Sequence, residues 1–552
     1  MRLTLTALAS QYIHMPLAPF CLKKAVDESL PQVETTICDL NINDTQEELL
    51  ARLMATEPDV VGVCLYIWNR ACAASLIRRL KALWPEVIVI VGGPEATFSV
   101  PESLADMPAD YLLRGAGEES LPALLRCLLT GDAPADVPGL CTRTADGLRL
   151  SAPAPAPAPR ADLYDEGWQL ALKGRMAYVE TSRGCPFSCA FCLSGSECSR
   201  TVQFMPQEEA LGLLIRLGQS GAETIKLIDR TFNCHRARTK FLLAGLIGAK
   251  QRGEIGDVCY HFEVAADLFD DETLDLLATA PAGLFQMEAG LQSFHAPTLA
   301  ACDRHTDMRL LVDRLTRIIA PGNVHLHIDL IAGLPMEDFA TFGQSFDCAF
   351  QLHPHQLQLG FLKLIHGSRL RETDWGQRYS PDPPYEVLST PWLTYPELRR
   401  LHAAAEAVER IHNSGRFALA EALALDTTGM RPFDLYLLLG ERMAAKQGRW
   451  SLDALTAMVH ETLMSLGVAQ NRLTDAMILD RLATDNTGYL PPVLQSADAS
   501  ALKAAARTVR DMRPDARRPR VALLSDGRAA LACWTRKHPV TQRGEVELIS
   551  LA

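Results

Sequence analysis

The feature that most constrains this chain is a set of three cysteines in one short stretch, Cys185, Cys189 and Cys192. Their CxxxCxxC spacing follows an extended run at residues 176–181, so the motif is expected on a loop that leaves a strand. Three thiolates on one loop can bind three irons of a four-iron, four-sulfur (4Fe-4S) cluster and leave the fourth iron without a protein ligand. A ferredoxin usually supplies four cysteines per cluster, and no fourth cysteine completes a ferredoxin spacing here. The motif therefore predicts a cluster with one open iron.

Other interpretations of these cysteines have less support. A zinc site normally has four nitrogen or sulfur ligands in two paired clusters, and no second CxxC follows. Thiols that are buried and bind nothing are a further alternative, but chance rarely produces this spacing in this context. Cys198, six residues further on, is interpreted as a loop thiol rather than as a fourth ligand.

The residues around the cysteines resemble the signature of the radical S-adenosylmethionine (SAM) family. From Glu180 to Cys192 the sequence is Glu-Thr-Ser-Arg-Gly-Cys-Pro-Phe-Ser-Cys-Ala-Phe-Cys, with the aromatic Phe191 before the last cysteine. In that family the open iron takes the amino and carboxylate groups of SAM. The resemblance implies cleavage of SAM to methionine and a 5′-deoxyadenosyl radical, with electrons from a reductant such as flavodoxin or ferredoxin.

Length and charge limit the class of protein. A chain of 552 residues suggests roughly three domains of about 150 residues. With 54 basic and 66 acidic residues the net charge is −12, which disfavours a general nucleic-acid binder. No apolar run approaches the ~18 residues of a membrane span, so no membrane association is expected. The apolar run within residues 1–10 is too short for a signal peptide and is interpreted as a buried strand. Fifteen cysteines fit a reducing cytosol, so we expect a cytoplasmic protein.

Residues 1–145 alternate in the manner of a doubly wound parallel sheet, an α/β fold covered by helices on both faces. Strand-like runs occur at residues 3–8, 33–38, 60–65, 87–91 and 111–113, with helical periods at 45–55 and 71–83. Ligands of such sheets bind at the carboxyl ends of the strands, where residues 10–14, 66–69 and 92–95 would meet. The candidate binding residues at these ends are Tyr66, Asn69, Gly92, Gly93 and Glu95.

This first domain resembles the cobalamin-binding domain that precedes the radical SAM domain in one subgroup of that family. The resemblance lies in Val-Val-Gly-Val-Cys-Leu-Tyr-Ile-Trp-Asn, in Val-Gly-Gly-Pro-Glu, and in Leu-Arg-Gly-Ala-Gly-Glu-Glu-Ser. The chain departs from the family's DxHxxG signature after the first strand. The resemblance thus implies cobalamin bound with its dimethylbenzimidazole tail detached and no histidine beneath cobalt. His14 lies in the corresponding loop at the wrong spacing, and we expect it to be a packed or capping histidine.

Residues 146–175 are interpreted as a linker. Within it, residues 151–159 read Ser-Ala-Pro-Ala-Pro-Ala-Pro-Ala-Pro, a composition that cannot form a helix and favours an extended polyproline II spacer.

Residues 176–370 form six strand and helix units, which fit a partial (β/α)6 barrel better than a closed eightfold barrel. In a barrel, polar residues at the carboxyl ends of strands face the active site. Such residues include Asp229, Glu263, Asp267, Glu288 and Asp329. The strands are expected near residues 177–181, 224–228, 260–264, 285–289, 325–331 and 356–364.

The radical SAM resemblance covers this whole segment and gives several residues a role. Asp229 occupies the place of the motif that binds the SAM amino group, although the usual Gly-Gly-Glu is absent. Glu263 matches the carboxylate that meets the SAM ribose or the reacting centre, and we take Asp229 and Glu263 as the catalytic candidates. Phe191, Glu288 and Gly333, the last in the strand that flanks adenine, join them as cofactor-binding candidates.

Each of these candidates also has an ordinary structural interpretation. A carboxylate at the end of a strand can form a salt bridge with no functional role. The aromatic residues Trp68, Phe191 and Phe232 are, as a class, more often core residues than cofactor contacts.

Residues 371–552 are expected to form a mostly helical domain. Helical periods occur at residues 398–412, 433–446 and 451–466, and a strand pair is expected around Gly527 within residues 521–551. With the two domains before it, this region resembles proteins that end in a domain of unknown function named DUF4080.

The leading function is methylation of an unactivated carbon in a small-molecule or peptide substrate, using the 5′-deoxyadenosyl radical and methylcobalamin. Radical cyclisation or rearrangement without methyl transfer uses the same parts. A sensor that binds a cluster or a corrin without catalysis is the alternative from a different class. Methylthiolation of RNA is disfavoured because neither a second cysteine triad nor a basic terminal domain is visible.

Overall fold

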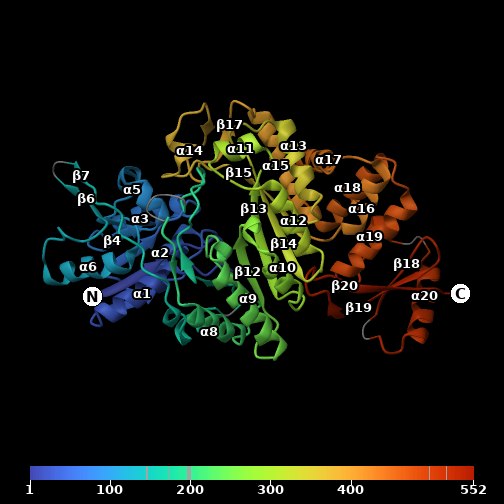
Figure 1. Ribbon diagram of the computed structural model, residues 1–552, viewed down its shortest axis with the longest axis horizontal. Coiled ribbons are helices and arrows are strands. Elements are labelled where there is room, and N and C mark those ends of the chain that lie inside the picture. Colours follow the sequence, from blue (N-terminus) through green and yellow to red (C-terminus); the bar gives the residue numbers. More distant parts are fainter. Residues whose placement is uncertain (145–146, 173, 195–199, 496–497, 517–518, 552) are drawn as a thin grey trace. The chain divides into compact units, whose positions relative to one another are not determined.

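The computed structural model describes residues 1–144, 147–172, 174–194, 200–495, 498–516 and 519–551 (Figure 1). They form two compact units. None of the helices in these ranges is long and apolar enough to cross a membrane. Unit 1 comprises Met1–Leu284, Ala300–His305 and Leu362–Leu388, and unit 2 comprises Phe285–Leu299, Thr306–Phe361 and Ser389–Ala552.

Unit 1 begins with a sheet that confirms the five predicted strands. The strand order is β2-β1-β3-β4-β5-β6-β7, and β1 to β5 are parallel. The antiparallel strands β6 and β7 were not predicted. Every residue of β3 is buried, as expected for a central strand covered on both faces. The strands are β1 (Arg2–Thr6), β2 (Glu34–Ile37), β3 (Val60–Cys64), β4 (Ile88–Gly92), β5 (Tyr111–Leu113), β6 (Leu140–Thr144) and β7 (Gly147–Arg149).

Helices cover both faces of this sheet, each with its own hydrophobic core (Figure 1). On one face, Val26 of α1 and Leu124 of α6 share a core with Leu5 of β1. On the other, Leu53 of α2 shares a core with Val61 of β3. The doubly wound fold is confirmed. The helices are α1 (Ala18–Ser29), α2 (Gln46–Met54), α3 (Arg70–Leu83), α4 (Pro94–Phe98), α5 (Val100–Asp106) and α6 (Gly117–Thr130).

The proline-rich stretch at residues 151–159 contains no helix, as predicted, and it is hydrogen-bonded to the first domain. Ala154 pairs with Gly115 as an isolated bridge, and its backbone N–H donates to the Arg114 carbonyl at 2.9 Å. A short 3-10 helix (Ala161–Leu163) and helix α7 (Glu166–Ala171) follow. The stretch therefore packs along the first domain before the chain enters the next sheet.

The six strands predicted for the barrel are all present in the described part of the chain. In unit 1, β11 lies between β8 and β12, and all three are parallel. In unit 2, β14 lies between β13 and β15, again in parallel. The unit 1 elements are β8 (Ala177–Val179), β9 (Ser182–Arg183), β10 (Gln203–Phe204), α8 (Gln207–Gly218), β11 (Thr224–Leu227), α9 (Arg236–Gln251), β12 (Cys259–Val264) and α10 (Asp271–Ala278). The others are β13 (Phe285–Gln292), α11 (Ala296–Ala301), α12 (Met308–Ile319), β14 (Val324–Ala332), α13 (Phe339–Phe350) and β15 (Gln356–Phe361).

The alternation along β14 shows how these strands are built. Leu326, Ile328 and Leu330 have no exposed surface. His325 and Asp329, whose side chains point to the opposite face, keep partial exposure. One face of the strand is thus apolar and closely packed, whereas the other carries polar side chains.

The C-terminal region is mostly helical, and its three predicted helices are confirmed. The expected strand pair is instead three antiparallel strands, because β20 adds to the β18–β19 hairpin around Gly527. The elements of unit 1 here are α14 (Arg369–Glu372), β16 (Arg378–Tyr379) and β17 (Val387–Ser389). Unit 1 ends at Leu388, within β17. Those of unit 2 are α15 (Tyr395–Ala407), a π-helical turn (Val408–His412), α16 (Ala418–Thr428), α17 (Pro432–Ala444), α18 (Leu452–Ser465), α19 (Gln470–Thr484), α20 (Ala499–Met512), β18 (Arg520–Leu523), β19 (Ala529–Lys537) and β20 (Gly544–Ile549).

Glu337 is a fully buried carboxyl group that joins the turn after β13 to helix α13. One of its oxygens accepts hydrogen bonds from the hydroxyls of Ser293, at 2.6 Å, and Ser345, at 2.8 Å. Burial outweighs these bonds and raises the pKa of Glu337 to about 7. The folded protein therefore holds a proton on this carboxyl group that the unfolded chain loses near pH 4.3.

This raised pKa predicts that stability falls as the pH rises. The contribution to the free energy of unfolding is fully present below the unfolded pKa of about 4.3 and is lost as the pH passes through the folded pKa of about 7. It amounts to about 4 kcal/mol. Glu337→Gln keeps the shape but cannot ionise. Urea unfolding should show that the free energy of unfolding of wild type falls, relative to that of this variant, as the pH rises from 5 to 8. Glu461→Gln, at an exposed position, serves as control. If the free energy of unfolding changed equally with pH in wild type and in Glu337→Gln, the prediction would be wrong.

Candidate cofactor-binding site

The loop from Gly184 to Cys192 carries the three cysteines and leaves the short strand β9. Gly184 has φ of +97°, a left-handed conformation that favours glycine at the start of the loop. Within the loop, the Cys192 N–H donates to the Cys189 carbonyl at 3.1 Å, and the Ala190 N–H donates to the Cys302 carbonyl at 2.9 Å. Backbone hydrogen bonds therefore hold the loop, and the three cysteine side chains take no part in these bonds.

The three thiols suit a cluster that takes three protein ligands. Cys185 is buried, Cys189 and Cys192 are half-buried, and none of them forms a disulfide. Burial raises the pKa of Cys189, an effect that Arg304 opposes and that the Cys192 and Cys185 thiols reinforce. The Arg304 guanidinium lies 3.6 Å from the Cys189 sulfur. The thiols are thus close enough to influence one another, beside a cation that favours thiolate. Cys198 lies outside the described residues.

Asp229 lies directly after β11 and has no exposed surface. One carboxylate oxygen accepts hydrogen bonds from the backbone N–H groups of Thr181, at 2.7 Å, and Ser182, at 3.0 Å. The other accepts from the Thr181 hydroxyl at 2.6 Å. Burial raises the pKa of Asp229, and these hydrogen bonds oppose that shift. The carboxylate therefore fixes the backbone that leads into the cysteine loop, and the SAM contact expected for it stays a prediction.

Arg238 of α9 was not singled out in the sequence, yet it acts on the same peptide. Its guanidinium donates to the Thr181 carbonyl at 3.1 Å, and the residue is 5% exposed. Asp229 and Arg238 therefore fix the two sides of one peptide unit at the end of β8. No sequence motif indicated this, because the helix carrying Arg238 becomes a neighbour only in the fold.

An ion-pair network connects the base of the cysteine loop to the first domain. Arg183 pairs with Glu180 at 2.7 Å and with Glu118 of α6 at 2.5 Å. Burial is the main cause that raises the pKa of Glu180. Tyr164 accepts a hydrogen bond from the Glu180 N–H at 2.8 Å. Glu118 belongs to the Leu-Arg-Gly-Ala-Gly-Glu-Glu-Ser run, so two runs that the sequence analysis treated separately meet in the structure.

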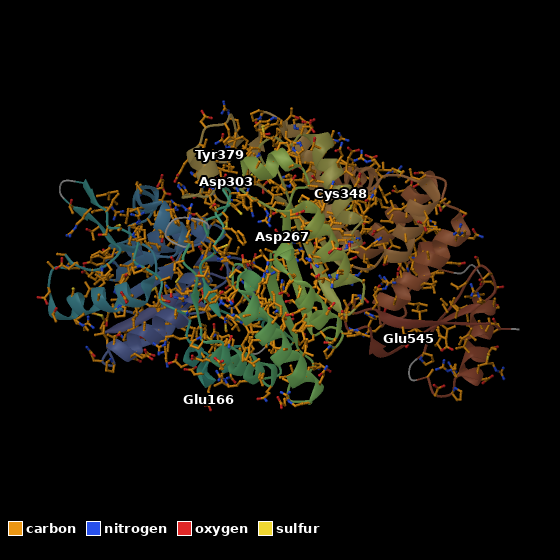
Figure 2. The ribbon with its side chains drawn as sticks, viewed as in Figure 1. Glu166, Asp267, Asp303, Cys348, Tyr379 and Glu545 are labelled. Atoms are coloured by element: carbon orange, nitrogen blue, oxygen red, sulfur yellow. The ribbon has the colours of Figure 1, made fainter. Side chains whose placement is uncertain are left out.

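The remaining barrel candidates lie on the predicted strands or in the segments that follow them. In unit 1, Phe191 of the cysteine loop and Glu263 of β12 are half-buried, and Asp267 follows β12 in a 3-10 helix (Ala266–Leu268). Figure 2 labels Asp267 among the side chains. Phe232 is core, as expected, because it is 2% exposed and stacks on Phe262. The roles predicted for Phe191 and Glu263 stay predictions.

In unit 2, a buried histidine lies between two carboxylates. His327 Nε2 is 3.0 Å from an Asp329 oxygen, and its Nδ1 is 3.8 Å from a Glu288 oxygen. Gly333 follows β14 with φ of +89°. The sequence analysis missed His327, although its alternation with His325 and Asp329 along one strand was a usable signal. The cofactor contacts expected for Glu288 and Gly333 stay predictions.

In the first domain, Asn69 fixes the loop after β3. Its side-chain carbonyl accepts from the Tyr66 N–H at 2.8 Å, and its amide donates to the Cys64 carbonyl at 3.0 Å. Tyr66 stacks on Trp68, with ring centroids 4.3 Å apart. Trp68 is 50% exposed, so the expectation of a core residue was wrong: its ring rests on Tyr66 beside solvent. This stacked pair gives the strand ends an apolar surface that fits a large, mostly apolar ring such as a corrin.

The two glycines after β4 differ in what they tolerate. Gly93 has φ of +100°, and a Cβ there would lie 2.7 Å from the Leu65 carbonyl oxygen. At Gly92 the nearest atom would be the Leu113 carbonyl oxygen at 3.5 Å, an ordinary contact. Gly93 is therefore required by the fold itself, whereas the Cβ of an alanine at Gly92 is sterically acceptable to the protein.

Glu95 and His14 already have protein partners. Glu95 is 2% exposed and pairs with Arg70 at 3.1 Å. The His14 Nδ1 is 2.6 Å from the Tyr178 hydroxyl on β8, which fits the packed histidine that the sequence suggested. Burial lowers the pKa of His14, and Lys226 adds to this. The ligand contact expected for Glu95 stays a prediction.

Three family models match the chain, in the order that the sequence suggested. A B12 binding domain matches residues 4–125. The Radical SAM superfamily matches residues 179–348, a range that includes the cysteine loop, and the protein of unknown function DUF4080 matches residues 373–518.

Individual relatives agree with these assignments. The cobalamin-dependent radical SAM methyltransferase TokK of Streptomyces tokunonensis is 27% identical over 54% of this chain and 46% of its own length. The hopanoid C-3 methylase of Methylococcus capsulatus is 30% identical over 36% of this chain and 40% of its own. The chain thus spans less than half the length of either relative.

A solved structure supports the fold. The cobalamin-dependent S-adenosylmethionine radical enzyme OxsB matches with a TM-score of 0.60 at 14% identity, over 87% of this chain and 79% of its own. The likeness to this structure concerns the fold, whereas the family models show which domains follow one another: a B12 binding domain, a domain of the radical SAM superfamily and a DUF4080 region, in that order.

Proposed function

We propose that the protein is a cobalamin-dependent radical SAM enzyme that methylates an unactivated carbon of a small-molecule or peptide substrate. The observation that carries the proposal is the cysteine loop, whose three thiols form no disulfide and which the ion pair of Arg183 with Glu118 joins to a helix of the B12 binding domain. The similarity to TokK, a methyltransferase by name, supports methyl transfer over the other outcomes. A reductant of the flavodoxin or ferredoxin type and a cytoplasmic location belong to the same proposal.

The chain's own residues would have separate tasks. Cys185, Cys189 and Cys192 would hold the cluster, while Asp229 and Arg238 keep the start of their loop in place. When bound, the cluster with SAM would supply a 5′-deoxyadenosyl radical, and cobalamin would supply the methyl group. The protein residues around the bound cofactors must exclude water, because a primary radical is quenched in solvent.

Activity is the direct test of this proposal. The whole protein would be reconstituted anaerobically with iron, sulfide and cobalamin, then supplied with SAM and a reductant. We expect release of 5′-deoxyadenosine, and mass spectrometry of cell extracts treated with the enzyme should find a metabolite or peptide heavier by one methylene. Failure to cleave SAM under these conditions would contradict the enzymatic role.

Replacing Cys185, Cys189 and Cys192 by alanine should remove the cluster. The reconstituted variant should lose both the absorbance near 400 nm and SAM cleavage, because no other group of thiols is expected to bind the irons. Cys348→Ala is the control: its thiol is exposed, carried by α13 and labelled in Figure 2. If the triple variant retained the cluster absorbance, the ligand assignment would be wrong.

Asp229→Asn should impair SAM cleavage without loss of the cluster. The amide oxygen could accept from the Thr181 and Ser182 N–H groups, but the amide NH2 would then face the Thr181 hydroxyl, which now donates to the carboxylate. Loss of the charge also weakens all three bonds, so we expect the approach to the cysteine loop to shift. A displacement of about 1 Å costs about 100-fold in rate, and we expect a loss of about 10- to 100-fold. The fully exposed Asp257→Asn is the matched control. Wild-type cleavage by Asp229→Asn would show that this carboxylate has no bearing on the reaction.

His14→Ala should leave cobalamin binding within about twofold of wild type, because the imidazole is engaged with Tyr178. Electron paramagnetic resonance of the cob(II)alamin form should show no three-line nitrogen splitting in either protein. A three-line splitting in the wild type that vanishes in the variant would instead identify His14 as a cobalt ligand.

A further inference from the structure

The stretch Leu362–Leu388, here called the connecting segment, follows β15 in the chain but belongs to unit 1. It includes the first residues of the DUF4080 match, which begins at residue 373. Its contacts lie on two parts of unit 1: the cysteine loop and the turn after β4.

At one end, the connecting segment binds the cysteine loop. The Leu370 N–H donates to the carbonyl of Ala190, which lies between Cys189 and Cys192. Arg369 donates to the Ser188 carbonyl and pairs with Asp303, whose side chain is labelled in Figure 2. This end therefore supports the loop through its backbone and leaves the three thiols untouched.

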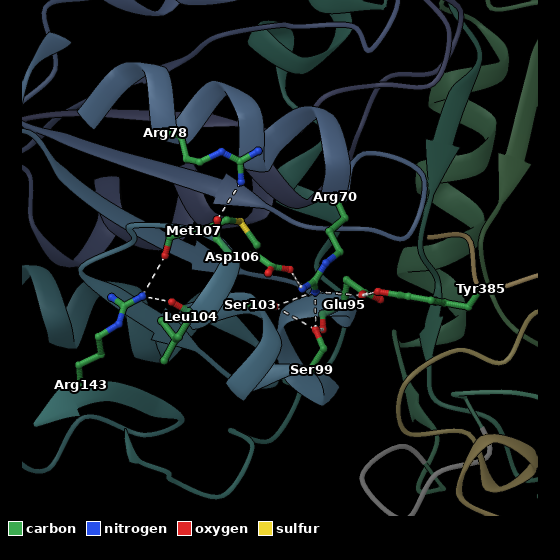
Figure 3. A network of polar contacts seen from close by, with 10 residues as sticks. All are labelled: Arg70, Arg78, Glu95, Ser99, Ser103, Leu104, Asp106, Met107, Arg143 and Tyr385. Atoms are coloured by element: carbon green, nitrogen blue, oxygen red, sulfur yellow. Dashed lines mark hydrogen bonds and ion pairs between the residues drawn. The ribbon is translucent and has the colours of Figure 1, made fainter. Parts of the chain in front are cut away.

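At the other end, Tyr385 binds Glu95. The Tyr385 hydroxyl donates to a Glu95 carboxylate oxygen at 2.5 Å, and both residues are 2% exposed. Figure 3 shows Tyr385 reaching this carboxylate from the side opposite most of the network. Burial is the main cause that raises the pKa of Tyr385, and Glu95 adds to it, so the hydroxyl keeps its proton and remains a donor.

The same Glu95 oxygen is bound by Arg70, which begins helix α3 directly after Asn69. Arg70 also donates to the hydroxyls of Ser99, at 2.7 Å, and Ser103, at 2.9 Å (Figure 3). Arg70 thus follows the loop that holds Tyr66 to Asn69, and Glu95 follows Gly92 and Gly93. One buried network therefore fixes both loops at which cobalamin is expected.

The connecting segment also packs closely against the residues that follow β4. Gly367 of the connecting segment has φ of +83°, and a Cβ there would lie 2.2 Å from the Phe98 ring. The Arg371 guanidinium lies 4.7 Å from the centre of the Tyr385 ring, and His366 meets that ring edge-on at 5.0 Å. The Tyr385 ring is therefore held in place from within its own segment.

We infer that the connecting segment positions the cobalamin-binding loops relative to the cysteine loop, and that Tyr385 is the residue through which it acts. The inference rests on the proposed function, since it takes cobalamin as the ligand of those loops. Tyr385 touches neither cofactor: it is a positioning residue that acts through Glu95. This gives a task to the first part of a region whose function is unknown.

Tyr385→Phe removes one oxygen atom and leaves the ring packing intact. Losing a hydrogen bond to a buried carboxylate loosens the turn that carries Glu95, and we expect cobalamin to bind about tenfold more weakly. Binding would be measured by absorbance titration of the whole, cluster-loaded protein with hydroxocobalamin. Iron content should be unchanged, because the cysteine loop is held by other bonds of the segment.

Tyr379→Phe is the matched control. Tyr379 lies in the same segment on β16, is labelled in Figure 2, and contacts Arg371 through its ring, which phenylalanine retains. This variant should bind cobalamin as wild type does. Wild-type affinity in Tyr385→Phe, or an equal loss in Tyr379→Phe, would overturn the inference. Absence of cobalamin binding by wild type would instead overturn the proposed function.

A double-mutant cycle tests whether Tyr385 acts through Glu95. Glu95→Leu removes both acceptor oxygens, while Arg70 keeps its bonds to the Ser99 and Ser103 hydroxyls. If the tyrosine acts through this carboxylate, adding Tyr385→Phe to Glu95→Leu should weaken cobalamin binding by much less than it does in wild type. Additive losses would show that the two residues act independently and would contradict the assigned route.

Discussion

A buried carboxylate has to be matched by hydrogen-bond donors, and this constraint organises the strand ends of unit 1. Asp229 has no exposed surface, and three donors from Thr181 and Ser182 surround it. Glu95 is met by Arg70 and Tyr385. Each carboxylate thereby fixes a loop that approaches a predicted cofactor. The loops keep their positions because moving them would take the donors away from a buried carboxylate. A buried charge without donors would strongly destabilise the fold.

This constraint changes how acidic residues at strand ends are interpreted. The barrel rule predicts that such residues face the active site, and it selected Asp229, Glu263 and Glu288 together. In the structure, both Asp229 oxygens are engaged with backbone and hydroxyl donors of the protein. Glu263 and Glu288 remain half-buried on the polar side of their strands. Residues of the same type at equivalent positions can therefore differ: Asp229 holds a loop in place, whereas the cofactor contacts predicted for Glu263 and Glu288 stay predictions.

The sequence predicted those parts of the fold that depend on neighbours along the chain. The run Val60–Cys64 indicated a buried strand because all its residues are apolar or small, and the three cysteines identified their loop because the chemistry requires that spacing. It could not predict contacts that only the fold creates. Glu95 and Tyr385 are 290 residues apart, and no pattern in either stretch points to the other. The third strand at the C-terminus was missed for a different reason: only Gly527 was taken as a turn, although β20 has six residues against four in β18.

The placement of the connecting segment separates chain order from spatial order. The boundary predicted at residue 370 falls inside a stretch that the structure groups with the cysteine loop and the B12 binding domain. The helices that follow pack within unit 2, where Gly440 of α17 lets the Ala403 backbone of α15 approach so closely that a Cβ would lie 2.3 Å from its carbonyl oxygen. Phe433 of α17 also packs on Phe342 and Phe346 of the barrel helix α13. One family region therefore contributes to both units: its first residues contact the loops of unit 1, and its helices pack with barrel elements of unit 2.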